Sequence, residues 1–234
     1  MISLAGGLWD RIYLNLIEDG RYWYLLNGLK ITLIVTFFAV ILGILIGLLV
    51  AVVKVAAAGN RKLRPLEFLV NLYITVIRGT PVMVQLLIIY FIVFSAVDVS
   101  QVVVAIVAFG INSGAYVSET IRSGILAVNK GQTEAGRSLG FTAWQTYRYI
   151  VLPQALKNIL PALGNEFIAL LKETAVVGYI GLQDLTMGGD IIRSRTYDAF
   201  IPLLTVAIIY LLFVMILSAG LKRLERRLRR SDQR

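Results

Sequence analysis

The sequence contains neither cysteine nor histidine. Disulfide bonds, thiolate nucleophiles, imidazole catalysis and the commonest zinc sites are therefore excluded. Charged residues are also scarce: they make up 16% of the 234 residues, whereas a soluble domain of this size carries about 25%. Because 58% of the residues are hydrophobic, the composition indicates a membrane protein.

Three stretches lack any charged residue, namely 31–53, 99–118 and 199–221. Each has between 20 and 23 residues, enough for a helix to cross a hydrocarbon core of about 30 Å at about 1.5 Å per residue. We therefore predict an all-α, multi-pass membrane protein rather than a soluble one. Two further segments, 66–97 and 157–182, are interrupted by polar residues but are also counted as spans. The expected spans are therefore about five, at 29–54, 66–97, 99–126, 157–182 and 199–221.

The first two expected spans each contain a motif that modifies a helix. In the second span, Pro81 of the segment Arg78-Gly79-Thr80-Pro81 removes a backbone donor, which predicts a kink or a break. In the first span, Gly43 and Gly47 form a GxxxG pair, which permits close contact with another helix, although glycine is common in membrane helices in any case.

Lysine and arginine residues are unevenly divided among the segments between the spans. Most of the 23 lie in the loop 54–64, in the interval 122–157 and in the tail. The positive-inside rule places these segments in the cytoplasm and the N-terminus outside. The net charge of +9 therefore reports topology and not nucleic-acid binding. The basic tail, 223–234, also suits contact with anionic membrane lipid.

Three further polar segments lie outside the expected spans. Residues 1–28 mix aromatic and charged side chains, which suits an amphipathic segment at the membrane interface. Residues 183–198 are expected to form a polar loop. The third segment, 130–153, is the longest, and it carries signals that a simple return loop does not need.

These signals are those of helix ends. Thr142 and Gln145 fit a capping box, and Gly140 is placed to end a preceding helix at about 132–139. We therefore predict two short helices that meet near Gly140. On these features alone, the segment is equally suited to packing on its own helix bundle and to binding a cytoplasmic partner.

The same segment contains a spaced motif: Glu134-Ala135-Gly136, Gly140, Ile150 and Leu152-Pro153. In this respect the chain resembles the permeases of ABC transporters, whose EAA motif is E-A-A, three residues, G, nine residues, I, one residue, L-P. Gly136 alone departs from the motif, where alanine is usual, and because glycine is also small we expect little harm to docking. The resemblance covers about residues 22–222 and implies the type I importer permease fold (MetI-like).

Other segments resemble the permeases for polar amino acids in particular. The resemblance implies a second permease subunit, identical or paralogous, a dimer of cytoplasmic ABC ATPases, and an extracytoplasmic substrate-binding protein. The ATPase would bind ATP and magnesium, and this chain would hold no cofactor. The resembling segments are Arg78-Gly79-Thr80-Pro81 followed by Gln85, Asn112-Ser113-Gly114-Ala115-Tyr116, and Leu171-Lys172-Glu173-Thr174.

The chain itself is not expected to be an enzyme. Residues 131–138 come close to a phosphate-binding P-loop, but an arginine replaces its lysine and a membrane helix, not a strand, precedes it. The acidic residues are scattered, so no metal site is expected. By resemblance, the partner ATPase would dock on Glu134, Ala135, Gly136, Arg137, Ser138, Leu139, Gly140 and Phe141.

Polar residues inside the expected spans are the candidate substrate contacts, because charges there are costly and usually face a pathway or a bundle interior. At about 1.5 Å per residue, Arg78, Asn112 and Glu166 lie near mid-depth, where an alternating-access site belongs. Arg78 suits an amino acid's carboxylate and Glu166 its ammonium group, unless the two form a structural pair. With the resemblance, the predicted contacts are Arg78, Gly79, Thr80, Gln85, Asn112, Ser113, Tyr116, Asn165 and Glu166.

The leading hypothesis is the transmembrane permease subunit of an ATP-driven importer of polar amino acids in the bacterial cytoplasmic membrane. The charge of Glu166 suggests arginine, lysine or histidine as substrate, although a carboxylate there equally suits any α-ammonium group. The alternative is an ATP-independent channel or an ion-coupled carrier, which would not need the long segment 130–153. A membrane enzyme is disfavoured because the usual catalytic residues are missing.

Overall fold

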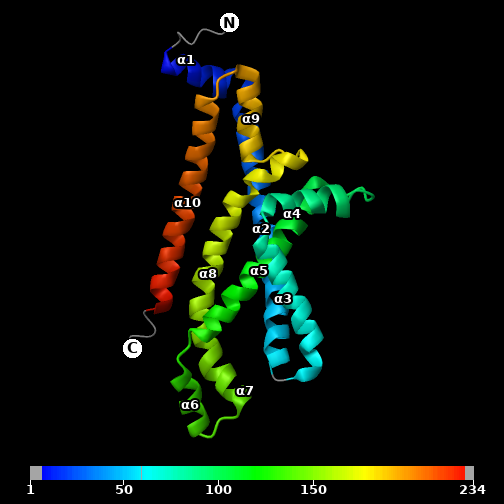
Figure 1. Ribbon diagram of the computed structural model, residues 1–234. Coiled ribbons are helices and arrows are strands. Elements are labelled where there is room, and N and C mark those ends of the chain that lie inside the picture. Colours follow the sequence, from blue (N-terminus) through cyan, green and yellow to red (C-terminus); the bar gives the residue numbers. More distant parts are fainter. Residues whose placement is uncertain (1–6, 59, 230–234) are drawn as a thin grey trace. The chain divides into compact units, whose positions relative to one another are not determined.

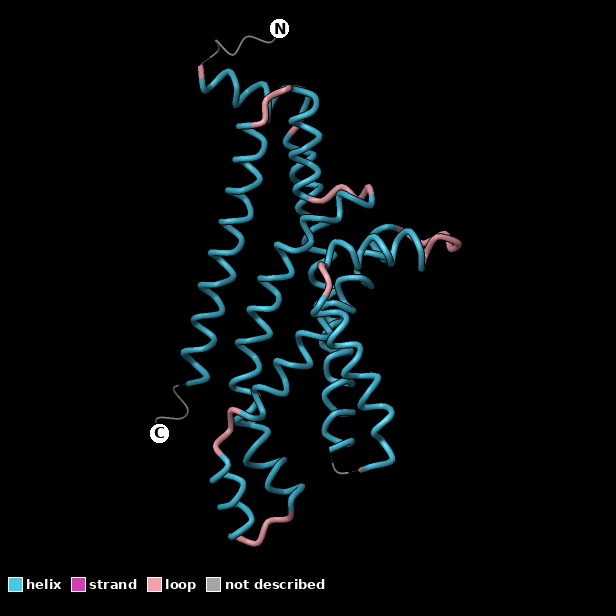
Figure 2. The backbone as a smooth tube through the Cα atoms, in the orientation of Figure 1, coloured by secondary structure: helices cyan, strands magenta, loops and turns pink. Residues whose placement is uncertain are grey.

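Every regular element in the part of the chain that the structure describes is a helix. The structure is a computed structural model that describes residues 7–58 and 60–229, and no strand occurs within these ranges (Figure 1, Figure 2). The predicted all-α class is therefore confirmed. The chain forms two compact units. Unit 1 comprises the described residues of Met1–Ala39, Pro81–Phe109 and Ala169–Ile216; unit 2 comprises those of Val40–Thr80, Gly110–Ile168 and Leu217–Arg234.

The helices are divided between the units as follows. Unit 1 holds α1 (Leu8–Ile12), α4 (Val82–Ile88) and α9 (Leu185–Thr196), and unit 2 holds α3 (Arg64–Gly79), α6 (Lys130–Ser138) and α7 (Ala143–Thr146). Both units receive parts of α2 (Tyr22–Ala58), α5 (Gln101–Leu126), α8 (Leu152–Glu173) and α10 (Phe200–Arg229). Short π-helical or 3-10 turns cover Tyr13–Ile17, Glu18–Gly20, Arg61–Leu63, Ile89–Val93, Tyr147–Val151 and Thr174–Ile180.

Three of the described helices are long and apolar enough to cross a membrane: Tyr22–Ala57, Gln101–Leu126 and Phe200–Leu228. A fourth span is added if the interrupted pair Arg64–Gly79 and Val82–Val93 is counted as one. Helix α8, the expected fourth of five spans, is not in this set, because polar residues such as Lys157 and Glu166 lower its hydropathy. Its passage through the membrane stays a prediction.

The break predicted at Pro81 is present. Helix α3 ends at Gly79 and α4 begins at Val82. Between them Thr80 is extended, with φ −123° and ψ 148°, because a residue that precedes proline is disfavoured in the helical region. Arg78 therefore lies in the last turn of a helix, next to an open piece of backbone.

The expectation of a loop at 183–198 is wrong, because most of this interval is helix α9. The Asp184 carboxylate caps it by accepting hydrogen bonds from the backbone N–H groups of Met187 (2.9 Å) and Thr186 (3.1 Å). Gly188 looks like a loop residue but serves close packing. A Cβ atom on Gly188 would lie 2.5 Å from the Tyr24 carbonyl oxygen of α2, so only glycine allows this approach.

The N-terminal segment is tied to the connection between α9 and α10 (Figure 1). Arg11 donates two hydrogen bonds to the Asp198 carboxylate, from Nη2 at 2.7 Å and from Nε at 3.0 Å. The Asn15 amide also donates to Asp198, at 3.0 Å, and its oxygen accepts from Thr196 at 2.7 Å. Helix α2 then begins at Tyr22, earlier than the expected start of the first span at 29.

The ion pair between Arg11 and Asp198 predicts that the attachment of the N-terminal segment depends on pH. The hydrogen bonds from Arg11 lower the pKa of Asp198 below its usual value. A carboxyl with a lowered pKa in the folded state stabilises the fold above its unfolded pKa of about 3.9, and the contribution is lost as pH falls through the folded pKa. Hydrogen exchange of the α1 amides, corrected for intrinsic rates, should therefore accelerate below about pH 4.

An Asp198→Asn variant should show fast α1 exchange at neutral pH already. The matched control is Asp190→Asn, because Asp190 pairs with Arg193 within α9 and does not hold α1. If α1 in Asp198→Asn exchanges as slowly as in Asp190→Asn, the ion pair does not anchor this segment.

In unit 2, Gly43 and Gly47 make the close helix contact that their spacing permits. A Cβ atom on Gly43 would lie 2.7 Å from Ser113 Cβ, and one on Gly47 would lie 2.8 Å from Val117 Cβ. Helix α5 also has a glycine at this contact, since a Cβ on Gly114 would lie 2.6 Å from Cγ2 of Ile46. Small residues on both helices therefore let α2 and α5 approach closely.

The crossing should be sensitive to a single methyl group. We expect Gly47→Ala to destabilise the protein by about 1–3 kcal/mol, because rigid core atoms must move. The matched control is Gly220→Ala in α10, where a Cβ would meet no described atom within 4 Å and helix propensity favours alanine by up to about 1 kcal/mol. Thermal unfolding in detergent measures both variants. A loss of stability no greater in Gly47→Ala than in Gly220→Ala would contradict the tight crossing.

Candidate functional site

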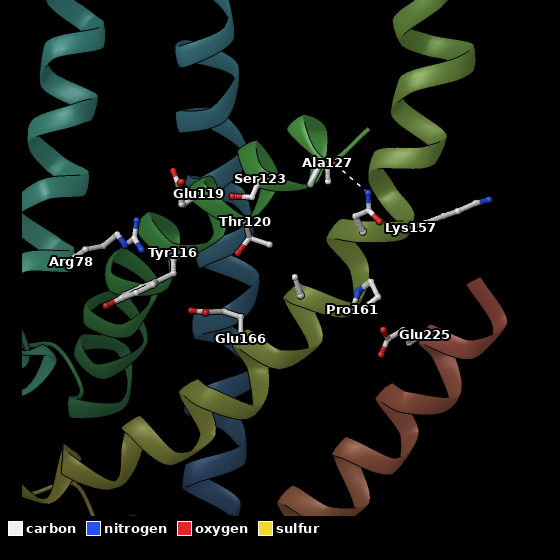
Figure 3. Close-up of a pocket in the computed structure, with 13 residues that line it drawn as sticks. Arg78, Tyr116, Glu119, Thr120, Ser123, Ala127, Lys157, Pro161, Glu166 and Glu225 are labelled. Carbon is white, nitrogen blue, oxygen red and sulfur yellow. Dashed lines mark hydrogen bonds between the residues drawn. The ribbon is translucent and has the colours of Figure 1, made fainter. Parts of the chain in front are cut away.

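A hollow in which charged residues of both signs gather lies in unit 2 (Figure 3). Its volume is about 510 Å³, within the range of about 300–1,000 Å³ that is typical of small-molecule sites. Residues of α3, α5, α8 and α10 line it, together with one residue directly after α5. They are Arg78, Tyr116, Glu119, Thr120, Ser123, Gly124, Ala127, Lys157, Asn158, Pro161, Ala162, Glu166 and Glu225.

One wall of this cavity is formed by the end of α3 and the middle of α5. The guanidinium of Arg78 lies over the Tyr116 ring, with its Cζ atom 5.2 Å from the ring centroid, which is a cation–π distance. Figure 3 shows both side chains at the same side of the cavity. An aromatic face and a cation are thereby held together beside the backbone break at Thr80.

Helix α8 contributes Glu166 to the cavity lining. The Ser113 hydroxyl of α5 donates a hydrogen bond to Oε1 of Glu166 at 3.0 Å. Ser113 is fully buried and Asn112 beside it is 3% exposed. The hydrogen bond orients the carboxylate from a rigid helix, so the Glu166 side chain is positioned by its neighbours in unit 2.

The cavity carries charges of both signs. Three carboxylates line it, on Glu119, Glu166 and Glu225, together with the cations Arg78 and Lys157. Glu119 is also bound by Arg122, whose Nε donates to it at 2.9 Å. A cavity with both signs of charge is chemically suited to a zwitterion that has separate anionic and cationic ends.

The polar segment 130–153 forms the predicted pair of short helices, α6 and α7, which lie beside each other (Figure 1). The predicted capping box is present: Thr142 Oγ1 accepts from the Gln145 N–H at 3.2 Å, and Gln145 Oε1 accepts from the Thr142 N–H at 2.8 Å. Gly140 has φ +86°. The N–H groups of Phe141 and Gly140 bond back to the carbonyls of Gly136 and Arg137, which is a Schellman ending of α6.

Gly136 faces the inside of this helix pair. It is buried, and a Cβ there would lie 2.8 Å from both Thr146 Cγ2 and Ile150 Cδ1. By contrast, Leu139 is 76% exposed and Trp144 is 69% exposed. The helix pair therefore has an exposed apolar surface in this chain. Gly136, the residue that departs from the EAA pattern, belongs instead to the internal packing of the pair.

Comparison with known proteins identifies the family. A model of the family described as "Binding-protein-dependent transport system inner membrane component" matches residues 43–230. The chain belongs to this family. It is a permease of an ABC transporter of the polar amino acid type, and a multi-pass protein of the cytoplasmic membrane.

Relatives of the permease share most of its length. It is 38% identical over 208 residues to the glutamine transport system permease protein GlnP of Escherichia coli, covering 88% of this chain and 93% of that protein. It is 38% identical over 211 residues to the arginine transport system permease protein ArtQ of Bacillus subtilis, covering 89% and 94%. A crystal structure of an amino acid ABC transporter with histidines matches with 46% identity and a TM-score of 0.81, covering 88% and 94%.

Family membership also implies which tasks lie outside the permease. An ABC importer needs an ATPase and a substrate-binding protein, and the ATPase of this family is a separate subunit. The permease is thus a subunit of an amino acid ABC importer.

The predicted substrate contacts are only partly brought together. Arg78, Tyr116 and Glu166 line the cavity, and Ser113 joins them through its hydrogen bond to Glu166. Asn112 is buried in α5 of the same unit. The others are absent from the cavity lining as described: Gly79, Thr80 and Asn165 belong to unit 2 and Gln85 to unit 1.

Sequence reasoning missed several lining residues, and one signal would have found some of them. Glu119 and Ser123 follow the predicted contact Tyr116 at intervals of three and four residues, so they share its face of α5. Lys157 and Glu225 carry no such signal, because they come from different helices.

Proposed function

We propose that the permease binds an α-amino acid in the cavity of unit 2 and releases it to the cytoplasm by alternating access. One observation carries this proposal: a single cavity of amino-acid size is lined by both Arg78 and Glu166. Arg78 offers donors to the α-carboxylate, and the carboxylates offer acceptors to the α-ammonium group. Tyr116 adds a flat apolar surface for the substrate's side chain.

A cationic amino acid is the substrate class that the charges favour. Of the three carboxylates, Glu119 is engaged by Arg122. With Glu166 and Glu225, the lining holds more carboxylates than one α-ammonium group needs, so a cationic side chain can also be met by a carboxylate. The names of the relatives, which refer to glutamine, arginine and histidines, are compatible with a site for polar side chains of this size.

Transport is proposed to be driven by ATP that a partner ATPase dimer binds with magnesium. The exposed surface of α6, from Glu134 to Phe141, is the proposed docking site for this partner. With few spans per chain, two permease copies, or a copy and a paralogue, would enclose the path. The N-terminus would lie outside, where the binding protein delivers substrate, and the α6–α7 pair and the tail would lie in the cytoplasm.

The test is reconstitution of the permease with its ATPase and binding protein in liposomes. We expect ATP hydrolysis to be stimulated by the liganded binding protein. We also expect uptake to depend on ATP in the compartment that the ATPase subunits face. Uptake of an amino acid by the permease alone, without ATPase, would instead support a channel or an ion-coupled carrier. Competition between arginine and glutamine for uptake ranks the two substrate classes.

A further inference from the structure

A second hollow in unit 2, called the α2–α5 groove below, has a different chemistry. It has a volume of about 300 Å³ and lies between the C-terminal turns of α2 and α5. Aliphatic residues form most of its lining, so it is unsuited to an amino acid or another fully polar ligand. The lining residues are Ala51, Lys54, Val55, Arg122, Ile125 and Leu126.

Two cations stand in this apolar groove. Arg122 uses its Nε and Nη2 groups on Glu119, which leaves Nη1 as a donor. Lys54 makes no ion pair with any carboxylate in the described ranges 7–58 and 60–229, although its charge also acts on Glu119. The single carboxylate of Glu119 thus partly neutralises both Lys54 and Arg122, and the groove keeps an excess of positive charge.

The groove continues into an apolar stripe on α2. Leu45, Leu48, Leu49, Val52 and Val55 follow at helical spacing, and each is at least half exposed. From Leu45 to Val55 a helix rises about 15 Å at about 1.5 Å per residue. This is half of a hydrocarbon core of about 30 Å. The stripe ends at the cations, near the end of α2 at Ala58.

We propose that this groove is a binding site for an anionic phospholipid. Lys54 and Nη1 of Arg122 hold the phosphate, and an acyl chain lies along the α2 stripe. Cations near the end of a spanning helix lie at the level of the lipid headgroups, and basic pockets between helices suit anionic headgroups. A free phosphate ion would make no use of the stripe, which is why a lipid fits better than a soluble anion.

The experiment is native mass spectrometry of the full-length permease in detergent, titrated separately with phosphatidylglycerol, phosphatidylcholine and glycerol 3-phosphate. We expect phosphatidylglycerol to be retained best. Lys54→Gln should weaken its binding about fivefold, as a surface lysine contributes about 1 kcal/mol to anionic lipid binding. Lys62→Gln is the matched control: it removes the same charge close by in sequence, outside the groove lining, and should leave binding unchanged.

A second variant tests the groove without removing a cation. Val55 is 64% exposed, so Val55→Glu should fold, and its carboxylate should repel the phosphate and lower phosphatidylglycerol binding as Lys54→Gln does. Equal losses in Lys54→Gln and Lys62→Gln, or equal retention of both phospholipids, would overturn the site. Binding of glycerol 3-phosphate as tight as that of phosphatidylglycerol would also overturn the site. A Lys54→Gln variant that changes the fraction of dimeric permease, but not the number of bound lipids, would do the same.

Discussion

Uptake of arginine by the reconstituted transporter should fall by about ten- to a hundredfold when Glu166 is replaced by glutamine. A hydrogen bond to a charged group contributes about 1.5–3 kcal/mol, and each 1.4 kcal/mol is a factor of ten in affinity. Glutamine keeps the shape of the side chain and an acceptor for the Ser113 hydroxyl. The loss would therefore report the missing charge in the cavity and not a change of packing.

The substrate dependence of this variant shows which ammonium or guanidinium group Glu166 meets. If arginine uptake falls and glutamine uptake does not, Glu166 meets the cationic side chain; if both fall together, it meets the α-ammonium group. Glu67→Gln is the matched control, because Glu67 lies in the first turn of α3 and outside the cavity lining. Unchanged uptake of both amino acids in Glu166→Gln would remove Glu166 from the site.

A gentler change separates orientation from charge. Ser113→Ala removes the hydroxyl that donates to Glu166 at 3.0 Å and leaves the carboxylate in place. This hydrogen bond orients the carboxylate but does not contact the substrate, so only part of its contribution of about 1.5–3 kcal/mol should appear in the affinity for substrate. We expect that affinity to fall only about two- to tenfold. A loss as large as that of Glu166→Gln would mean that Ser113 supports the fold of unit 2 and does not merely orient the carboxylate.

How far the cavity could be foreseen depends on where its residues stand in the chain. Arg78 and Glu166 were found because an isolated charge in an apolar run is conspicuous. Glu119 lies close to the end of α5, where charges are ordinary, so its place on the Tyr116 face carried no weight. Glu225 enters through tertiary packing: a Cβ on Gly164 would lie 2.4 Å from Leu221 Cδ1, so this glycine lets α10 approach α8. No periodicity in either segment reports that pairing.

The fold was predictable where one property dominates a segment. Hydropathy alone predicts α2, α5 and α10, and proline chemistry predicts the break at Pro81. It was not predictable at α9, since Gly188 and Gly189 are typical of loops when read in sequence. Their actual role depends on distant partners: a Cβ on Gly189 would lie 2.5 Å from Val206 Cγ2, and the partner is visible only in the folded chain.

The second large effect is expected at the proposed ATPase docking surface. Leu139 ends α6 and is 76% exposed, so replacing it with glutamine removes no internal contact of consequence. Central apolar residues of an interface often contribute at least about 2 kcal/mol. We therefore expect Leu139→Gln to weaken ATPase binding about thirtyfold and to abolish the stimulation of ATP hydrolysis by the liganded binding protein. Calorimetry with the purified ATPase, together with hydrolysis assays, measures the two effects.

The matched control distinguishes docking from a general response to an exposed polar substitution. Leu8 in α1 is 63% exposed and belongs to unit 1, so Leu8→Gln makes the same chemical change away from α6 and should leave ATPase binding intact. Gly136→Leu tests the internal packing of the helix pair: its side chain must displace Thr146 and Ile150, so α6 should be misplaced and coupling lost. If Leu139→Gln and Leu8→Gln bind the ATPase equally well, α6 is not the docking surface, and the segment 130–153 packs only within its own chain.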